Sequence, residues 1–267
     1  MIGTRAHDFK LPREELFKGI KTAGFDTMQL APAKSLATPP SPRDDESLLA
    51  LRAEFEGCGL NITVLGSYVD MCARNDDAYI DARNTYMDNL HAAKILGARV
   101  VGTETSGFRG SEDEREKQYV RLRESVLRIA ERAEKEEQDF GIEPVAAHTL
   151  NTPELTARLI KEVDSPRLRI VFDPWNLLTA DNIGAQRELF SRCFEAFADR
   201  VSAIHIKDGF HDARGYTPAL LGEGMIDLKW LLPKLREHIP SVDLLREETQ
   251  PAHEKTDIEF IKRWYNA

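Results

Sequence analysis

The stretch Leu168-Arg169-Ile170-Val171-Phe172-Asp173 decides the fold. A short, largely apolar run leads directly into a carboxylate. This pattern is typical of a strand that is buried on both faces of a parallel sheet and ends at a polar rim. The stretch Val201-Ser202-Ala203-Ile204-His205 repeats the pattern and ends in an imidazole. Because parallel strands need long crossover connections, usually helices, the two stretches predict alternating strands and helices.

Segments of the same kind recur from one end of the chain to the other. They are residues 2–6, 27–30, 61–65, 99–103, 142–146, 168–172, 201–206 and 242–245. Eight strand–helix units in 267 residues predict one (β/α)8 TIM barrel, a single α/β domain spanning residues 1–267. An open, doubly wound sheet is the alternative. It would carry a glycine-rich phosphate loop after its first strand, where this chain has Ala6-His7-Asp8-Phe9.

Signals for the starts and ends of helices lie between the strands. Ser111-Glu112-Asp113-Glu114 forms a capping box, and Thr152-Pro153 places a capping hydroxyl before a proline suited to a first helical turn. Gly97 is suited to end a helix in the left-handed conformation, and Pro12 and Gly24 bracket the first helix. Two long loops are expected on the catalytic face, one containing Pro39, Pro40 and Pro42 and the other spanning residues 207–225.

Composition excludes several classes of partner. The net charge is −9, which disfavours binding to nucleic acid because such binding needs a broad basic surface. The three cysteines are widely spaced and predict free thiols rather than a disulfide framework. The N-terminal residues are rich in charge, and no apolar run approaches the length of a membrane span. We therefore expect a cytoplasmic protein without a membrane partner, and a homo-oligomer stays open.

Polar residues stand where the expected strands end, on the rim where barrels build their active sites. In chain order they are His7, Gln29, Ser67 with Tyr68, Glu104, Glu143, Asp173, His205 and Glu247. The last four are separated by 30, 32 and 42 residues, close to one strand–helix unit each. One acid or histidine at a strand end is usually a cap or an ion-pair partner. Four on consecutive strands favour a metal site, because clustered carboxylates repel one another without a cation.

The four residues offer three carboxylates, one imidazole and no thiolate. This donor set predicts a divalent ion, with Mn²⁺ as the first expectation and Mg²⁺, Co²⁺ or Zn²⁺ as alternatives. Glu143 is less clear by position because Pro144 follows it, and Glu248 competes with Glu247 for the last place.

Several motifs around these residues resemble one known family. They are Gly141-Ile142-Glu143-Pro144, the stretch His148-Thr149-Leu150-Asn151-Thr152-Pro153-Glu154, Phe172-Asp173-Pro174-Trp175-Asn176, His205-Ile206-Lys207-Asp208, and Gly222-Glu223-Gly224 followed by Ile226-Asp227. Over essentially its whole length the chain resembles the sugar isomerase/epimerase family of xylose isomerase-like barrels. That family includes ketose 3-epimerases and inosose dehydratases and is distantly related to endonuclease IV.

The resemblance implies a function and roles for individual residues. It implies that Glu143, Asp173, His205 and Glu247 bind one divalent metal and that Glu143 and Glu247 are the catalytic acid/base pair. The metal would acidify a proton next to a ketose carbonyl and stabilise the enediolate formed when a carboxylate removes that proton. Returning the proton to the opposite face gives epimerisation, and returning it to the adjacent carbon gives isomerisation. The substrate class is then a small sugar or polyol.

The chain departs from the ketose 3-epimerases at three points. Asn176 stands where they carry a histidine, and Thr149 stands where they carry a second glutamate. Their arginine after the strand-7 histidine has no clear match, with His211 and Arg214 in the neighbourhood. His205-Ile206-Lys207-Asp208 looks more like the dehydratase branch. An inosose-type dehydratase with the same metal site therefore remains the first alternative, ahead of an endonuclease IV-like nuclease and a non-catalytic sugar-binding barrel.

Further rim residues are candidates for binding the substrate: His7, Glu104, His148, Asn176 and Lys207. Most of them have a purely structural alternative. His7 could be a packed rim histidine, Glu104 could pair with Lys207 or Arg109, and His148 could cap the next helix. Trp175 could form an apolar wall for a sugar face or pack against a neighbouring loop.

Overall fold

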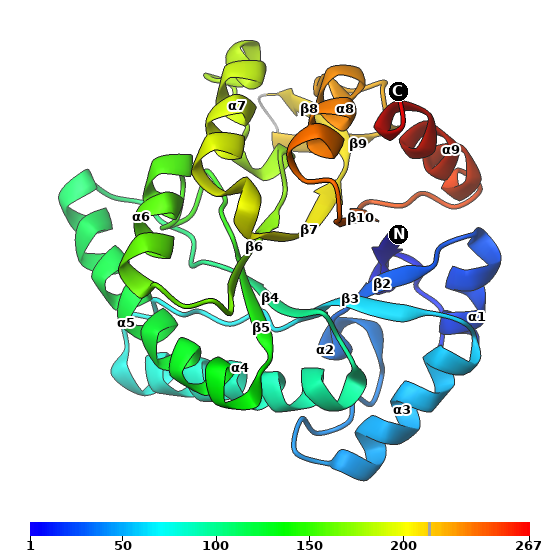
Figure 1. Ribbon diagram of the computed structural model, residues 1–267, viewed down its shortest axis with the longest axis horizontal. Helices are drawn as coiled ribbons and strands as arrows, with labels where there is room; N and C mark the ends of the chain where they lie inside the picture. Colours follow the sequence, from blue (N-terminus) through cyan, green and yellow to red (C-terminus); the bar gives the residue numbers. More distant parts are fainter. Residues whose placement is uncertain (213–214) are drawn as a thin grey trace.

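Eight parallel strands close into a barrel surrounded by helices, in a computed structural model that describes residues 1–212 and 215–267 (Figure 1). The strand order around the barrel is β1-β10-β7-β6-β5-β4-β3-β2. This arrangement confirms the predicted (β/α)8 barrel. Arg214, near the position of the epimerase arginine, lies outside the described residues.

The barrel strands and the helices alternate along the chain. The barrel strands are β1 (Ile2–Arg5), β2 (Thr27–Leu30), β3 (Asn61–Gly66), β4 (Val100–Glu104), β5 (Asp139–Glu143), β6 (Leu168–Phe172), β7 (Val201–Ile206) and β10 (Asp243–Arg246). The helices are α1 (Arg13–Ala23), α2 (Pro32–Ser35), α3 (Asp45–Gly57), α4 (Asp76–Leu96), α5 (Glu112–Glu136), α6 (Pro153–Val163), α7 (Gln186–Phe197), α8 (Leu228–His238) and α9 (Glu254–Tyr265). Short 3₁₀ turns occupy residues 6–8, 175–177, 183–185 and 198–200.

The expected helix boundaries are confirmed. Ser111 and Glu114 form the capping box of α5, and the Thr152 side chain accepts from the backbone amide of Leu155 at the start of α6. Gly24 and Gly97 end α1 and α4 with φ of 106° and 69°, in the left-handed conformation that glycine adopts without strain. The three cysteines are free, as expected.

The fifth strand differs from its prediction. The sequence places it at 142–146, but it spans Asp139–Glu143. Pro144 has no amide hydrogen and cannot continue the ladder, so the strand ends at Glu143. Asp139 looks too polar to begin a strand. It does so because its carboxylate pairs with Arg167 and Arg169 at 3.2 and 2.8 Å.

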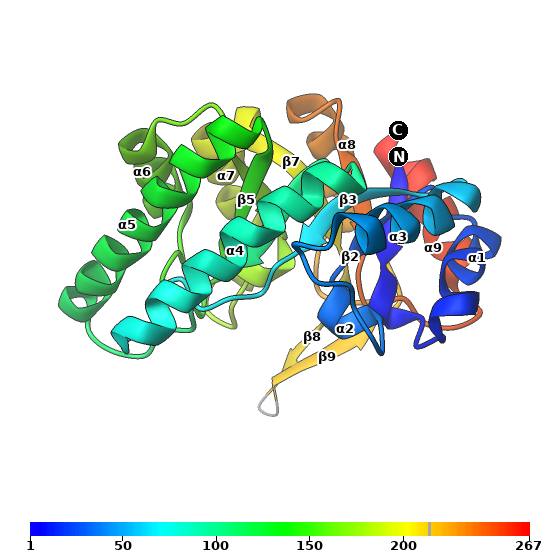
Figure 2. The same cartoon turned by 90° about the horizontal axis from the view of Figure 1, so that it is seen from below.

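The connection after β7 is not the plain loop that the sequence predicts. Its described part contains an antiparallel hairpin of β8 (Asp208–Asp212) and β9 (Gly215–Ala219). Figure 2 shows this hairpin projecting from the body of the barrel on the side where α2 lies. At the base of the hairpin, both carboxylate oxygens of Asp208 accept hydrogen bonds from backbone amides. The donors are Gly209, Gly222, Gly224 and Ile226, at 2.8–3.3 Å. Four donors on one buried carboxylate hold the base of the hairpin in place.

Strand alternation sorts the side chains into layers inside the barrel. Val64, Val100, Val171, Ala203 and Leu245 come from five different strands and form one buried cluster. A methyl group on Gly102 would lie 2.7 Å from Val64 and 3.4 Å from Val171, so this interior has no room for a larger residue there. Since inward positions recur every second residue, the residue two places further along each strand also points inward. For Val171, Ala203 and Leu245 that residue is Asp173, His205 and Glu247.

Among the described residues, no helix is both long and apolar enough to cross a membrane.

A buried ion pair outside the barrel fixes the end of β10. Arg246 is fully buried, and its Nε donates to Asp257 Oδ2 of α9 at 2.7 Å. Its guanidinium also donates to the backbone carbonyl of Glu247. The pair therefore ties α9 to the residue that carries the last rim carboxylate.

We expect Asp257→Ala to lower the free energy of unfolding by about 3–5 kcal/mol, because it leaves a buried guanidinium without its counter-charge. Urea denaturation followed by circular dichroism measures this change. The exposed Glu259 on the same helix is the matched control, and Glu259→Ala should change stability by less than about 0.5 kcal/mol. Equal effects of the two variants would contradict a structural role for the ion pair.

Candidate functional site

Side chains near the carboxyl ends of seven strands form a ring next to the apolar cluster. They are Arg5, Gln29, Glu104, Glu143, Asp173, His205 and Glu247. Their common direction follows from the strand period of two. Glu143, Asp173, His205 and Glu247 are all buried, with exposed fractions between 0 and 5%. The structure thus brings together the four residues expected to bind a metal.

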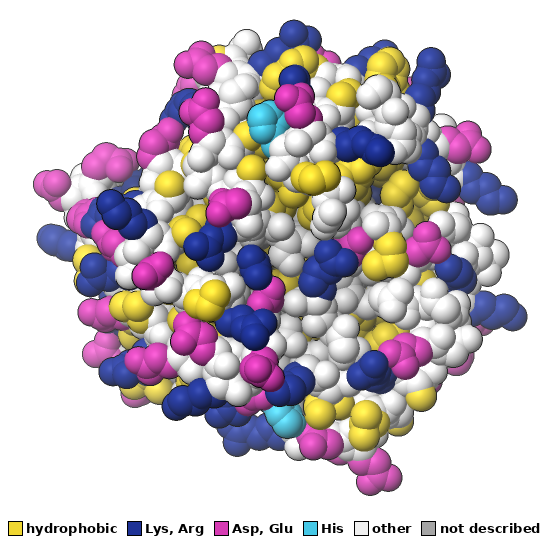
Figure 3. Space-filling model, viewed as in Figure 1, with side chains coloured by type: hydrophobic (Ala, Val, Ile, Leu, Met, Phe, Trp, Pro, Cys, Tyr) yellow, Lys and Arg dark blue, Asp and Glu magenta, His cyan; other side chains and the backbone are white. Residues whose placement is uncertain are grey.

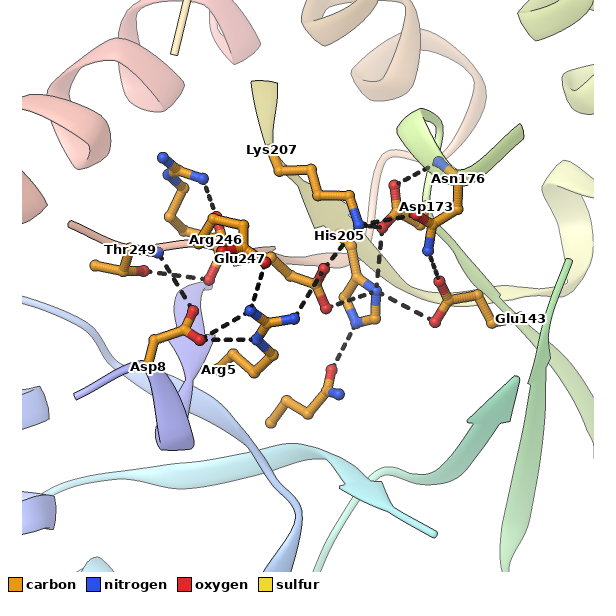
Figure 4. Close-up of polar contacts among 12 residues, drawn as sticks. Arg5, Asp8, Glu143, Asp173, Asn176, His205, Lys207, Arg246, Glu247 and Thr249 are labelled. Atoms are coloured by element: carbon orange, nitrogen blue, oxygen red, sulfur yellow. Dashed lines mark hydrogen bonds and ion pairs between the residues drawn. The ribbon is translucent and has the colours of Figure 1, made fainter. Parts of the chain in front are cut away.

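His205 stands at the centre of this ring (Figure 4). Its Nε2 lies 2.6 Å from the Oε1 atom of Gln29. Its Nδ1 faces Glu143 Oε2 and Glu247 Oε1, both at 3.4 Å, and Asp173 Oδ2 at 3.9 Å. If Nε2 carries the proton and donates it to Gln29, the Nδ1 lone pair points at the carboxylates. A partner that fixes one ring nitrogen while the other is free for a metal is typical of metal-binding histidines.

Lys207 lies two residues beyond His205 and closes one side of the ring. Its Nζ lies 2.7 Å from Asp173 Oδ2, 3.0 Å from Glu247 Oε2 and 2.9 Å from Asn176 Oδ1. Burial disfavours the charged lysine, but Asp173 and Glu247 outweigh it and raise the pKa of Lys207 well above its ordinary value. The ammonium therefore stays charged and all three of its protons are engaged.

The two glutamates differ in their partners. Glu247 accepts from Lys207 and also lies 3.4 Å from the Arg5 guanidinium. Burial favours the neutral acid, yet His205, Lys207 and Arg5 together hold the pKa of Glu247 below its usual range. Glu143 instead accepts from the neutral Asn176 amide at 2.5 Å. Glu247 is therefore fixed as a carboxylate by cations, whereas a neutral donor orients Glu143.

The charges of the ring are unbalanced without a further cation. Burial raises the pKa of Asp173 to about 6. Burial lowers the pKa of His205, but Glu247 and Glu143 more than compensate and raise it to about 9. Glu104, Glu143, Asp173 and Glu247 give a formal charge of −4, and Arg5 and Lys207 contribute +2. With a neutral imidazole, one divalent ion brings the sum to zero.

The donor atoms fit such an ion. One atom each from Glu143, Asp173 and His205 lies within 4.8 Å of the others, and Glu247 Oε1 lies beside the same imidazole nitrogen. Asp173 Oδ2 and His205 Nδ1 are both buried. Their close partners among the described residues are charged groups only, Lys207 for Asp173 Oδ2 and the surrounding carboxylates for His205 Nδ1. Carboxylate oxygens around one imidazole suit the divalent ions expected from the sequence. Of the two glutamates after β10, Glu247 faces the imidazole, whereas Glu248 pairs with Arg5 at 2.9 Å.

The remaining rim candidates surround this centre. Half-buried Glu104 is paired with His148 at 3.8 Å, rather than with Lys207 or Arg109. Burial, with help from Glu143 and Glu247, raises the pKa of Glu104 to about 7. His148 does not cap the next helix, because Thr152 does. His7 lies in the turn after β1, where burial lowers its pKa to about 4.

Asn176 and Trp175 follow Asp173 in a 3₁₀ turn. The backbone amide of Asn176 donates to Asp173 Oδ1 at 3.2 Å, and its side chain bridges Glu143 and Lys207. Trp175 packs against the hairpin, stacked on His211 at a centroid distance of 5.1 Å. Of the two alternatives left open for Trp175, the structure shows the packing against a neighbouring loop.

Sequence reasoning does not find roles for Arg5, Tyr68 and Gln29. Gln29 donates to the Tyr68 hydroxyl while its oxygen faces His205, so the two residues support the imidazole. The strand period is a signal that could have found Arg5, because it is a charged residue two places after Gly3 at the end of a strand.

The family assignment is confirmed by comparison with known proteins. The sequence model of the xylose isomerase-like TIM barrel family matches residues 17–264, and the chain belongs to that family. No curated protein sequence is similar enough to this chain to count as a match.

Several solved structures share the fold. A 3-keto-D-glucoside 4-epimerase from E. coli is 18% identical with a TM-score of 0.73, and 98% of each chain is covered. A D-tagatose 3-epimerase-like protein is 20% identical with a TM-score of 0.77, covering 99% of this chain and 98% of that one. The IolI protein, solved with a zinc atom, is 17% identical with a TM-score of 0.72, covering 99% and 95%. At these identities the likeness shows the fold alone.

We expect His205→Asn to weaken Mn²⁺ binding by at least about 100-fold, because it removes the central donor of the ring. Gln29→Leu should weaken it by about 10- to 100-fold, since it frees the imidazole to rotate. Titration calorimetry of the metal-free protein measures both constants. His91, a surface residue that pairs with Asp45 at 2.8 Å, is the control, and His91→Asn should bind Mn²⁺ like the unmodified protein. Unchanged binding by His205→Asn would place the metal elsewhere.

Proposed function

We propose that the protein is a divalent-metal-dependent sugar isomerase or epimerase that moves a proton next to a ketose carbonyl through an enediolate. The observation that supports this most directly is the placement of two inward-facing glutamates on either side of one imidazole nitrogen, each 3.4 Å from it. Membership of the xylose isomerase-like family and the sugar epimerases among its structural neighbours agree with the proposal.

The proposed ion, Mn²⁺ in the first instance, would be held by Glu143, Asp173, His205 and Glu247. When bound, it would supply Lewis-acid polarisation of the substrate carbonyl and the neighbouring hydroxyl. The chain supplies the remaining components, namely a base, a proton on the opposite side and an oriented ligand set.

Glu143 is the proposed base, because its only close side-chain donors among the described residues are the neutral Asn176 amide and the shared His205. It would take the proton from the carbon beside the carbonyl. Glu247 would return a proton on the opposite face, and it would take that proton from Lys207, whose Nζ lies 3.0 Å from its Oε2. Return from that side inverts the carbon, whereas return by Glu143 to the adjacent carbon gives isomerisation.

Dehydration by an inosose-type lyase is the second candidate. The observation that favours it is the position of Lys207, a charged ammonium that touches two of the proposed ligands. The proposed first step is the same removal of a carbon-bound proton. An acid such as Lys207 or His148 would then protonate a leaving hydroxyl, and water would depart in place of proton return.

A nuclease and a non-catalytic barrel have less support. A multinuclear zinc nuclease needs several histidines, and the inward-facing ring contains His205 alone among the described residues. On the face seen in Figure 3, side chains of both signs are interspersed rather than gathered into a basic area for nucleic acid. A non-catalytic barrel would have no use for closely packed carboxylates that repel one another.

Deuterium exchange tests the proposal. The protein loaded with Mn²⁺ is incubated in D₂O with a panel of ketoses and inososes, and uptake is read by mass spectrometry. We expect uptake of deuterium without loss of water for at least one member. Glu143→Gln should reduce the rate by about 10²- to 10⁴-fold, since an amide cannot act as the base.

The exposed Glu223→Gln is the matched control and should exchange at the unmodified rate. Glu247→Gln should also reduce exchange strongly, and an unchanged rate would contradict its acid/base role. Uptake with loss of one water would favour the dehydratase. No uptake with any member, despite bound metal, would count against the proposed function.

A further inference from the structure

A cavity of about 420 Å³ opens directly beside the carboxylate ring. It lies between the loops that follow β5 and β6 and the hairpin β8–β9. Asn176 and Lys207, which touch the proposed metal ligands, form part of its wall. Its volume is in the range of sites that bind small molecules. A chemical group bound in this cavity could therefore belong to the same substrate molecule as a sugar bound at the carboxylate ring.

Most of the cavity wall is apolar. Carbon surfaces come from Val145, Ala146, Ala147, Trp175, Leu178 and Ala180. Trp175 is stacked on His211 with an interplanar angle of 12°, and the Tyr216 ring lies 5.2 Å from Trp175 between centroids. Aromatic rings fixed against one another form a rigid, flat surface, which favours a planar group over a flexible chain.

Most side-chain polar groups on this wall already have partners, and the exception among the described residues is the buried Nε2 of His211. Lys207 uses its three protons on Asp173, Glu247 and Asn176, and the Asn176 amide is shared between Glu143 and Lys207. The Thr179 hydroxyl accepts from the Asn182 amide at 3.3 Å, and the Tyr216 hydroxyl lies 3.3 Å from the Asp208 carbonyl.

A second sugar ring in this cavity would bury several hydroxyls, whereas His211 Nε2 is the one side-chain group of the described wall left without a partner, so most of these hydroxyls would stay unpaired at a cost for each. An apolar ring would lose nothing by leaving water. The cavity lining therefore favours an apolar ring over a second sugar ring of similar size.

We propose that this cavity binds an apolar, planar ring attached to the sugar, so that the substrate is an aryl glycoside whose sugar ring carries a free carbonyl (an oxo-sugar) rather than a free ketose. The inference rests on the proposed function, because that function puts the sugar at the ring of carboxylates. The aglycone lies between Trp175 and the small side chains of Ala147 and Ala180. The hairpin contributes one wall, and Asp208 holds the base of that hairpin.

Calorimetric titration tests the pocket without requiring turnover. The probes are phenyl β-D-glucopyranoside, methyl β-D-glucopyranoside and cellobiose, each titrated into the Mn²⁺-loaded protein. We expect the phenyl compound to bind at least about tenfold more tightly than the methyl compound, because the two differ only in apolar surface. Cellobiose should bind no better than the methyl compound.

Filling the cavity should remove this preference. Ala147 is exposed, so Ala147→Phe can be accommodated without disturbing the core, and Ala180→Leu is a second variant at the opposite side. Both should reduce the phenyl-to-methyl ratio to about two or less, because the added side chain occupies the space of the aryl ring. Ala53→Phe, at an exposed position on α3 outside the cavity lining, is the matched control and should keep the ratio.

Equal binding of the phenyl and methyl compounds, tighter binding of cellobiose, or a ratio unaffected by both filling variants would overturn the aryl assignment. These results are independent of deuterium exchange. Selective binding of the phenyl compound without deuterium exchange by the ketoses, the inososes and an aryl glycoside of an oxo-sugar would keep the pocket and reject the proposed chemistry. Exchange with free ketoses but no preference for the phenyl compound would support the proposed chemistry and reject the aryl pocket.

Discussion

Repulsion among carboxylates enclosed in a barrel is the constraint on which the rest of the site depends. Alternation along each strand points Glu143, Asp173 and Glu247 into the same small space, where little water is left to screen their charges. Such a ring is stable only if cations are built into it or bound by it. Lys207 and Arg5 supply part of this charge from the chain itself. The negative charge that they leave uncompensated is the physical reason why a divalent ion fits the centre of the ring.

The cations also determine what each carboxylate can do. Those beside Glu247 hold it ionised and immobile, whereas Asn176 orients Glu143 without adding charge. Asn176 thus connects Glu143, the proposed base, to Lys207, and a single loop residue helps to set the difference between two chemically identical side chains. Gln29 acts similarly on the imidazole from the opposite side of the barrel. These neutral amides orient the site, and the charged groups determine its electrostatics.

The repeating features of the molecule could be predicted from the sequence, whereas the irregular ones could not. Spacing of about one strand–helix unit placed Asp173, His205 and Glu247 on one rim, because a barrel repeats its geometry. The prediction for the fifth strand is wrong because Asp139 is favourable there only through its pairs with Arg167 and Arg169, which are distant in sequence. The hairpin could not be predicted because its base is held by backbone amides that bind the buried Asp208, and these contacts form only in the folded chain. The stacking of Trp175 on His211 likewise requires the folded chain.

The regular and the irregular parts of the fold also differ in their proposed roles, because the regular strands carry the proposed metal ligands and the irregular loops form the cavity beside them. The proposed ligands lie at strand ends, whose positions the barrel fixes, while the apolar cavity is built from loops and the hairpin, which can change without altering the ring. Where the ketose 3-epimerases carry a polar histidine and glutamate, this chain has an engaged Asn176 and a buried Thr149, and apolar side chains lie nearby. Loss of hydroxyl-binding groups beside a retained carboxylate ring is expected if the proton transfer is unchanged and the substrate presents a less polar group on that side. Under the proposed function, the departures from the epimerase pattern are then explained by selectivity and do not require a loss of activity.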